Sequence, residues 1–180
     1  MGNDLTMPPA PADTIRYCPK CAAGILHWQT PLNFECGACG FMLYLNVAAA
    51  VAVIIECRGK ILFGVRKNEP GRGMLDLPGG FVDAGESADE CARREVQEET
   101  GIVLGQLQYL SSFPNTYLFR DVLYNTLDII LVSTLEDMPA ACAGDDLADL
   151  VWVQDDAVDY DRIAFPSLRK AVRLFLASRR

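Results

Sequence analysis

Residues 79–102 constrain the fold of this chain more than any other segment, because a loop with paired glycines leads into a helix with well-marked ends. Ser87 and Glu90, three residues apart, form a capping box, which is typical of a helix N-terminus. Gly101 suits the left-handed position that follows a helix C-terminus. The segment therefore predicts a loop that starts at Gly80 and a helix that runs from Ser87 to Gly101.

Three glutamates, Glu95, Glu98 and Glu99, lie close together on this helix. At about 100° per residue, Glu99 falls within about 60° of Glu95 on one side, and Glu98 falls about 60° away on the other. Small or apolar residues occupy the same arc, namely Ala88, Cys91, Ala92 and Val96. The three carboxylates are therefore expected on the half of the helix that turns toward a sheet.

Carboxylates in one arc repel one another, and burying an ionised carboxylate without a partner costs far more than that repulsion. A divalent cation relieves both costs. Because oxygen ligands favour hard cations, the cluster predicts Mg²⁺ or Mn²⁺ with coordination positions left open for water and phosphate. The alternative, from the glutamates alone, is a solvated helix whose acids pair with arginines.

The spacing of the whole segment resembles the Nudix box at every defined position. The pattern reads Gly80, five residues, Glu86, seven residues, Arg94-Glu95, an aliphatic residue, one residue, Glu98-Glu99, one residue, Gly101 and an aliphatic residue. The chain is thus similar to the Nudix hydrolases. That resemblance implies an α/β fold, an α/β/α sandwich with a mixed sheet, and hydrolysis of a pyrophosphate bond.

The resemblance also implies a role for each clustered acid. Glu95 and Glu99 would be the principal ligands of the catalytic Mg²⁺ or Mn²⁺. Glu98 would be a further ligand, or the residue that orients or deprotonates water. Because such cations neutralise phosphate oxygens and lower the pKa of bound water, cleavage of a P–O–P bond needs little covalent help from the protein.

Supporting roles follow from the same resemblance. Arg94 would orient the glutamates through Glu86, and a purely structural ion pair is the alternative for both residues. Gly79 and Gly80 lack side chains, which would let backbone carbonyls approach the metal, with Gly80 as a metal ligand.

Apolar patterns on both sides of the box predict the rest of the domain. The first two strands form a hairpin through the turn Cys-Arg-Gly-Lys. Strands are expected at residues 46–56, 60–67, 106–113, 123–136 and 148–154, and a closing amphipathic helix at residues 167–180. Because strands and helices interleave with hairpins, the pattern favours a mixed sheet between helices over a doubly wound parallel sheet.

Four clustered cysteines precede this domain as two Cys-x-x-Cys pairs separated by fourteen residues, namely Cys18, Cys21, Cys36 and Cys39. This spacing is typical of zinc ribbons with four thiolate ligands, and redox chemistry or disulfides are the alternative. Since a ribbon this small has almost no apolar core, Zn²⁺ would be structural. Gly40 suits a tight knuckle after the second pair, Ala22 replaces that glycine after the first, and His27 is interpreted as a surface or packing residue.

These features predict three parts. Residues 1–13, rich in proline and small residues, are expected to be a flexible leader. Residues 14–44 form the predicted zinc ribbon, and residues 45–180 form the predicted Nudix hydrolase domain.

A zinc ribbon directly before a Nudix domain resembles the bacterial NADH pyrophosphatase group. That group has a Ser-Gln-Pro-Trp-Pro-Phe-Pro array after the box, which Ser112, Pro114 and Tyr117 fit and which Phe113, Asn115, Thr116 and Leu118 do not. Tyr117 is predicted to stack on a nucleobase with help from Phe119, and Pro114 lies in the same region; packing is the alternative for both aromatics. NAD(H) or ADP-ribose is favoured as the substrate, while the base and the leaving group stay open.

The net charge of −8 disfavours a broad basic face, so nucleic acid is not an expected partner. No apolar run reaches the ~20 residues of a membrane span, and paired cysteines without an export signal favour a soluble cytoplasmic protein. The expected partner is a small nucleotide, with a homodimer as one option. The alternative functions are hydrolysis of nucleoside triphosphates or diadenosine polyphosphates, and a non-enzymatic Nudix nucleotide sensor.

Overall fold

The computed structural model describes residues 11–120, 122–144 and 146–179. The chain divides into two compact units, residues 1–47 with 116–125 and residues 48–115 with 126–180. The first break lies close to the expected boundary at residue 45. The grouping of residues 116–125 with the N-terminal unit was not predicted.

Most of the expected flexible leader, residues 1–10, lies outside the described residues. Its last three residues belong to a short helix, α1 (Pro11–Thr14). The Thr14 hydroxyl and the backbone N–H of Ile15 each donate to the Pro11 carbonyl at 3.0 Å, which closes this single turn.

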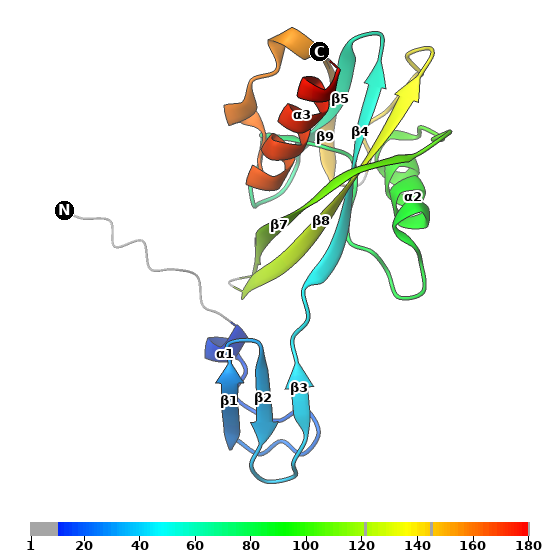
Figure 1. Cartoon of the computed structure of the whole chain (residues 1–180). Helices are drawn as coiled ribbons and strands as arrows, with labels where there is room; N and C mark the ends of the chain where they lie inside the picture. Colours follow the sequence, from blue (N-terminus) through cyan, green and yellow to red (C-terminus); the bar gives the residue numbers. More distant parts are fainter. Residues whose placement is uncertain (1–10, 121, 145, 180) are drawn as a thin grey trace, which may run out of the picture. The chain divides into compact units, whose positions relative to one another are not determined.

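The N-terminal unit contains an antiparallel sheet of three strands, β1 (Leu26–Thr30), β2 (Asn33–Cys36) and β3 (Met42–Tyr44) (Figure 1). Phe34 is fully buried, and its ring centroid lies 4.9 Å from that of Trp28, its cross-strand partner. A core built around one aromatic pair buries little apolar area, so the unit needs another source of stability.

The larger sheet is mixed and has six strands in the order β6-β5-β4-β8-β7, with β9 paired to β5; it belongs to the C-terminal unit except for residues 116–125. The strands are β4 (Ala48–Cys57), β5 (Lys60–Arg66), β6 (Leu75–Asp76), β7 (Gln108–Phe119), β8 (Val122–Leu135) and β9 (Leu147–Gln154). The strand β4 forms the predicted hairpin with β5 and pairs in parallel with β8 along its whole length. The predicted fold class is confirmed.

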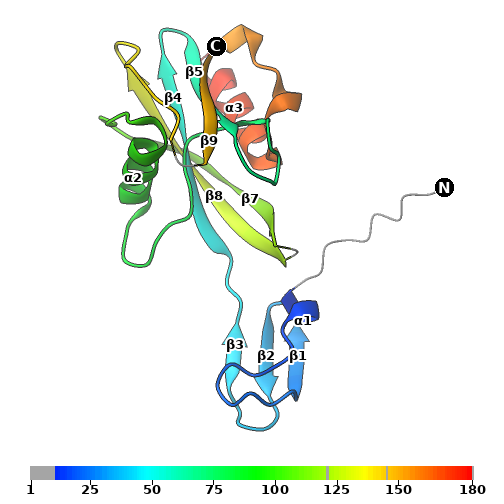
Figure 2. The same cartoon turned by 180° about the vertical axis from the view of Figure 1, so that it is seen from behind.

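Two helices cover opposite faces of this sheet, α2 (Ala88–Thr100) and α3 (Pro166–Ser178), as Figures 1 and 2 show from both sides. Two short 3-10 helices, η1 (Asp155–Ala157) and η2 (Tyr160–Arg162), lead from β9 to α3. Along β4, Ile54 packs into the core beneath α3, whereas Val53 and Ile55 pack into the core beneath α2. Because both faces of β4 are covered, its sequence is continuously apolar rather than alternating.

Several strands differ from the expected bounds by one or two residues, and three elements show differences with a structural reason. The strand β7 continues past Pro114 to Phe119, because a terminal strand of a sheet tolerates a residue without an N–H group. The two-residue strand β6 lies in a segment expected to be loop, where Asp76 pairs with Gly64. The helix α3 begins at Pro166 rather than beyond it, because proline at the first helical position has no N–H that needs a partner.

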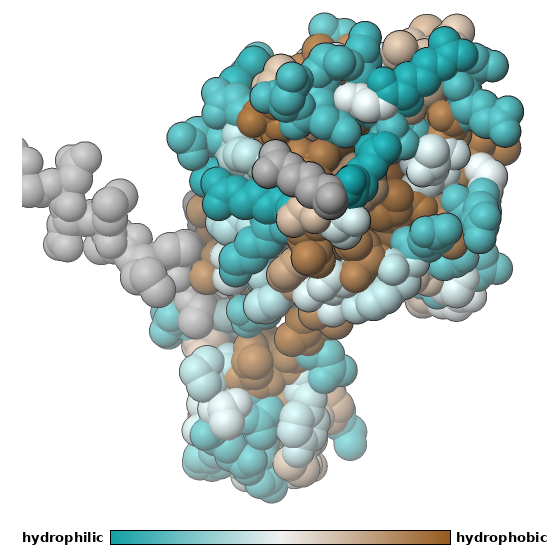
Figure 3. Space-filling model, turned by 45° about the horizontal axis from the view of Figure 1, so that its top comes forward, coloured by the Kyte–Doolittle hydropathy of each residue, from teal (hydrophilic) through white to brown (hydrophobic). Residues whose placement is uncertain are grey.

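Figure 3 shows apolar surface among hydrophilic residues on the face that it views. Large apolar side chains that are exposed include Phe81, Tyr109 and Phe119. Among the described residues, no helix has the length and apolar character needed to cross a membrane.

Candidate active site

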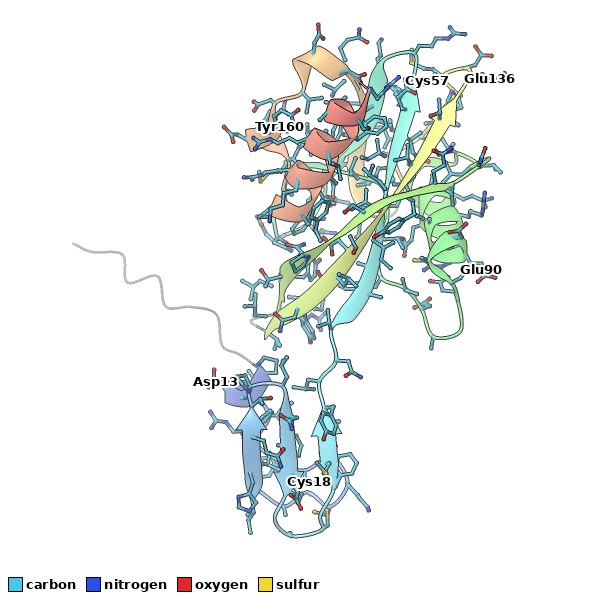
Figure 4. All side chains as sticks on the ribbon, viewed as in Figure 1. Asp13, Cys18, Cys57, Glu90, Glu136 and Tyr160 are labelled. Atoms are coloured by element: carbon cyan, nitrogen blue, oxygen red, sulfur yellow. The ribbon has the colours of Figure 1, made fainter. Side chains whose placement is uncertain are left out.

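The helix α2 has the ends that its sequence predicts. The Ser87 side chain accepts a hydrogen bond from the backbone N–H of Glu90, and the Glu90 carboxylate accepts one from the backbone N–H of Ser87 at 2.7 Å. Glu90 thus lies in the first turn of the helix (Figure 4). At the other end, Gly101 is left-handed, with φ of 73°, and its N–H donates to the carbonyl of Gln97 at 2.9 Å. The predicted capping box and glycine cap are both confirmed.

The paired glycines lie between β4 and α2. Backbone N–H groups of β4 donate to the carbonyls of Pro78 and Gly80, each at 2.8 Å, so the loop follows the strand. A Cβ added to Gly79 would lie 2.2 Å from the carbonyl oxygen of Val51. A Cβ added to Gly80 would lie 2.4 Å from Oε1 of Glu95. Gly79 therefore excludes any side chain, because its neighbour is backbone, whereas a side chain at residue 80 would displace the Glu95 carboxylate. The loop backbone thus comes into direct contact with this carboxylate.

The three glutamates occupy different environments on α2. Glu99 is 7% exposed, and its Oε2 accepts a hydrogen bond from the Gly79 N–H at 2.9 Å. Glu95 is partly buried against Gly80. The side chain of Glu98 is 52% exposed, so the expectation that all three turn toward the sheet is wrong for this residue. Glu98 lies at the edge of the predicted arc, where the helix surface meets solvent.

Arg94 joins the loop to the helix. Its Nη2 donates to Oε1 of Glu86 at 2.7 Å and its Nε to Oε2 at 3.2 Å, which makes a bidentate pair. Its Nη1 lies 2.8 Å from Oε1 of Glu95 and 3.3 Å from Oε2 of Glu98. A further bond runs from Nη2 to the carbonyl of Phe81 at 3.3 Å. The expected contact between Arg94 and Glu86 is present, and a catalytic role for either residue stays a prediction.

The electrostatic environment separates Glu86 from Glu99. Hydrogen bonds from Arg94, and then from the backbone N–H of Asp83, lower the pKa of Glu86 to about 2. Burial raises the pKa of Glu99 to about 8, with the hydrogen bond from Gly79 acting against it and the negative charges of Asp76 and Glu95 adding to it. Glu99 is therefore a carboxyl group whose charge lacks a sufficient counter-charge within the protein.

The residues present fit a hard divalent cation. Glu95 and Glu99 contact the two consecutive glycines, and a cation beside them would supply the charge that Glu99 lacks. Arg94 forms ion pairs with the carboxylates of Glu95 and Glu98. Among the described residues, the glutamates do not place three ligand atoms within 4.8 Å of one another. The Gly80 carbonyl accepts the N–H of Val51 at 2.8 Å, and the Cys91 Sγ lies 4.0 Å from it, so its assignment as a metal ligand stays a prediction.

The four paired cysteines come together at one end of the N-terminal sheet, where Figure 4 labels Cys18. All four Sγ atoms lie within 4.8 Å of one another, with Cys18 to Cys39 at 3.8 Å and Cys21 to Cys36 at 3.6 Å. Sulfur atoms on a tetrahedral Zn²⁺ would be about 3.8 Å apart, given Zn–S bonds of about 2.3 Å. The arrangement therefore fits a zinc ribbon.

The two cysteine knuckles have the same backbone geometry. Gly40 has φ of 68°, and its N–H donates to the Cys36 carbonyl at 2.9 Å; Ala22 has φ of 59°, and its N–H donates to the Cys18 carbonyl at 2.8 Å. Ala22 thus adopts the left-handed conformation despite its Cβ. His27 lies against the second knuckle, since a Cβ added to Gly37 would be 2.5 Å from its Nε2, and it is not one of the clustered ligand residues.

The residues predicted to bind the substrate lie on β7. The rings of Tyr117 and Phe119 are stacked with centroids 6.3 Å apart, and the Arg120 guanidinium lies 5.2 Å from the Phe119 centroid. Pro114 is exposed. Tyr117 and Phe119 belong to the N-terminal unit and the glutamates to the C-terminal unit, so their participation in one site stays a prediction.

Two acidic residues near the glutamates, Asp76 and Asp146, were not among the predicted site residues. Asp76 is 9% exposed on β6 and forms an ion pair with Arg66, and burial raises its pKa to about 6. Asp146 precedes β9, and its negative charge contributes to the raised pKa of Glu99. An acid inside the apolar stretch Met-Leu-Asp-Leu was a usable signal for Asp76, whereas Asp146 had none.

Comparisons with known proteins match most of this chain. A family model described as NUDIX domain matches residues 45–175. The ADP-ribose pyrophosphatase of Methanocaldococcus jannaschii is 51% identical over 63 residues, which cover 35% of this chain and 37% of that protein. The NAD-capped RNA hydrolase NudC of Vibrio cholerae is 32% identical over 103 residues, which cover 57% of this chain and 38% of that protein. The match thus spans well under half the length of these two relatives.

Solved structures show the same fold. A NUDIX hydrolase from Nitrosomonas europaea superposes with a TM-score of 0.72 at 21% identity, covering 92% of each chain. The NUDIX domain of Shewanella oneidensis NrtR, complexed with ADP ribose, gives a TM-score of 0.64 at 20% identity, covering 75% of this chain and 90% of that one.

Proposed function

This chain belongs to the NUDIX domain family, and from that membership we propose that it is a divalent-metal-dependent pyrophosphohydrolase. Its substrate would be a nucleoside diphosphate linked to another moiety, and one product would be a nucleoside monophosphate. In the reaction, a water oxygen bonds to one phosphorus, the bond from that phosphorus to the bridging oxygen breaks, and the water proton passes to a carboxylate or to solvent.

One observation carries the proposal: Glu99 and Glu95 flank consecutive glycines on the buried side of α2, with Glu99 held by the Gly79 N–H. Glu95 and Glu99 would hold Mg²⁺ or Mn²⁺, since both cations prefer oxygen ligands. When bound, the cation neutralises phosphate charge and lowers the pKa of water. Glu98, exposed beside them, would orient this water or accept its proton, and Arg94 with Glu86 would keep the loop and helix in register.

The favoured substrates are NAD(H) and ADP-ribose. Support comes from the names of the two relatives, an ADP-ribose pyrophosphatase and an NAD-capped RNA hydrolase. Tyr117 and Phe119 offer stacked aromatic faces for a nucleobase, and Pro114 lies on the same strand. Nucleoside triphosphates and diadenosine polyphosphates are the alternative substrates, and nucleotide sensing without catalysis is the alternative function.

Zn²⁺ on Cys18, Cys21, Cys36 and Cys39 would be structural, because the small core of the N-terminal unit cannot supply much folding free energy. The unbridged cysteine pairs support a cytoplasmic location, where thiols stay reduced. A homodimer is consistent with the exposed apolar residues of the ribbon, such as Met42 and Tyr44.

The test is product analysis by chromatography. The purified protein is incubated with Mg²⁺ or Mn²⁺ and one candidate substrate at a time. The candidates are NADH, ADP-ribose, diadenosine polyphosphates, FAD and the common triphosphates. Metal-dependent release of AMP from NADH or ADP-ribose, far faster than from the others, supports the proposal. Cleavage of triphosphates alone selects the alternative substrate. Tight nucleotide binding by calorimetry without any cleavage selects the sensor.

A further inference from the structure

We propose that Gly144 is a positioning residue for the acidic last turn of α2. It lies in the connection between β8 and β9, outside the predicted box. An effect of Gly144 on catalysis rests on the proposed function. Its effect on the position of the helix turn can be measured without any substrate.

The last turn of α2 needs external support. The final carbonyls of a helix have no partner within it, and negative charge near them is unfavourable because the helix dipole is negative at that end. Glu98 and Glu99 lie in this turn, and it contains no basic residue. Gly101 satisfies only the carbonyl of Gln97.

The connection before β9 supplies the missing donors. The backbone N–H of Gly144 donates to the Glu99 carbonyl at 2.8 Å, and the N–H of Cys142 donates to the Thr100 carbonyl at 3.2 Å. The first bond holds the backbone of Glu99, which carries the buried carboxylate, and the second holds the residue that follows it. They therefore act on the position of Glu99 rather than on its chemistry.

Only glycine permits this approach at residue 144. A Cβ added there would lie 2.6 Å from the carbonyl oxygen of Glu98. That oxygen belongs to the helix backbone and cannot rotate away as a flexible side chain would. An alanine at this position must therefore displace either the connection or the last turn of α2.

The connection is anchored on its far side. The N–H of Leu147 donates to the Gly144 carbonyl at 3.0 Å, and the N–H of Lys67 donates to the Asp146 carbonyl at 2.9 Å. The Asn68 side chain also donates to Oδ1 of Asp146 at 2.9 Å. Because these bonds hold the connection at the end of β5, an alanine at residue 144 would displace the last turn of α2 rather than the connection. Glu99 then moves away from the Gly79 N–H.

Gly105 offers a matched control. It lies in the same unit and close to the end of α2, and a Cβ added to it meets no atom within 4 Å. Gly105→Ala changes composition and unfolded-chain entropy as Gly144→Ala does, but it does not press on the helix.

The experiment compares the wild type, Gly144→Ala and Gly105→Ala in zinc-loaded full-length protein. Mn²⁺ binding is measured by electron paramagnetic resonance, and amide hydrogen exchange is followed over residues 97–101. In Gly144→Ala we expect Mn²⁺ affinity to fall about tenfold and the exchange rate of the Gly101 amide to rise roughly tenfold. The thermal midpoint of the variant protein should be retained. Gly105→Ala should stay within about twofold of the wild type for both.

Wild-type Mn²⁺ affinity and exchange in a folded Gly144→Ala protein would overturn the proposal. If that variant does not fold, hydrogen exchange in the wild type provides the test. The amides of Gly144 and Cys142 should be protected together with that of Gly101. Rapid exchange of the Gly144 and Cys142 amides would overturn the proposal. Neither measurement uses a substrate. A wild type that binds Mn²⁺ but cleaves nothing would therefore count against the proposed function and leave this inference to be judged on its own data.

Discussion

The backbone N–H of Gly79 donates to Oε2 of Glu99 at 2.9 Å, which joins the glycine loop to the buried side of the acidic helix. The bond places an almost fully buried carboxylate directly against a backbone that no side chain shields. The same carboxylate has a raised pKa because it is buried among other acids. A cation bound beside Glu99, as proposed, would supply the counter-charge that this carboxylate lacks.

Glu99→Gln should lower kcat by at least about a hundredfold, because it removes a charge that acts mainly in the transition state. The fold should be retained, since the amide can still accept the Gly79 N–H. Turnover of the preferred substrate and circular dichroism are the measurements. Asp89→Asn, an exposed acid on the same helix, is the control and should change kcat little. Near-normal turnover by folded Glu99→Gln would remove Glu99 from the proposed machinery.

The stability of protein freed of Mg²⁺ and Mn²⁺, with zinc retained, should fall as the pH rises. The pKa of Glu99 is about 8 when folded, against an ordinary value of 4.5. A carboxyl group with a raised folded pKa favours folding fully below its unfolded pKa, and this contribution is lost as the pH rises through the folded pKa. We expect Tm to decline between about pH 5 and pH 8.5, and Glu99→Gln to flatten part of the decline.

Added Mg²⁺ should restore Tm at the upper end of this range in the wild type, because a bound cation stabilises the ionised carboxylate. Calorimetry across the pH series measures both effects. Identical pH profiles for the wild type and Glu99→Gln would contradict the assigned environment of Glu99.

Arg94→Lys should lower kcat about tenfold, roughly 1.4 kcal/mol, because lysine cannot make the bidentate pair with Glu86 while also contacting Glu95 and Glu98. The neighbouring Arg93→Lys is the control, since Arg93 donates to the Leu104 carbonyl instead. Steady-state kinetics on both variants provides the comparison. Equal effects of the two substitutions would leave Arg94 with a general structural role only.

Ala22→Gly should stabilise the zinc ribbon by about 1 kcal/mol, because Ala22 holds a left-handed conformation that glycine adopts without steric cost. Gly40→Ala should destabilise it by about the same amount, since Gly40 occupies the equivalent place in the second knuckle. The rate at which a chelator removes zinc measures both. A faster loss from Ala22→Gly would show that the two knuckles are not equivalent.

Removal of zinc should unfold residues 14–44, because one aromatic pair supplies most of the small core there. The readout is the near-ultraviolet signal of Trp28, which packs on Phe34, with Trp152 replaced by phenylalanine to isolate it. Readdition of Zn²⁺ is the control and should restore the signal. An unchanged signal after complete chelation would contradict a structural zinc.

Much of the site could be predicted because it lies in one continuous segment. Ser87, Glu90 and Gly101 define the helix by local hydrogen bonds, and their spacing alone indicates them. The four cysteines are equally readable, since ligand chemistry limits their spacing. In contrast, the exposure of Glu98 and the burial of Glu99 depend on how the last turn meets the connection before β9, which the helical period does not specify.

The sequence by itself determined the family, the caps of α2, the loop glycines and the thiolate set, because each depends on residue types at fixed short spacing. Only the tertiary structure decided which acids from distant segments face Glu99, as Asp76 and Asp146 do, and which glycine supports its backbone, as Gly144 does. The physical reason is that the number of residues between two positions in the sequence does not indicate whether they come into contact. They arise when β6, α2 and the connection before β9 pack around one sheet, and packing depends on the whole core rather than on local pattern.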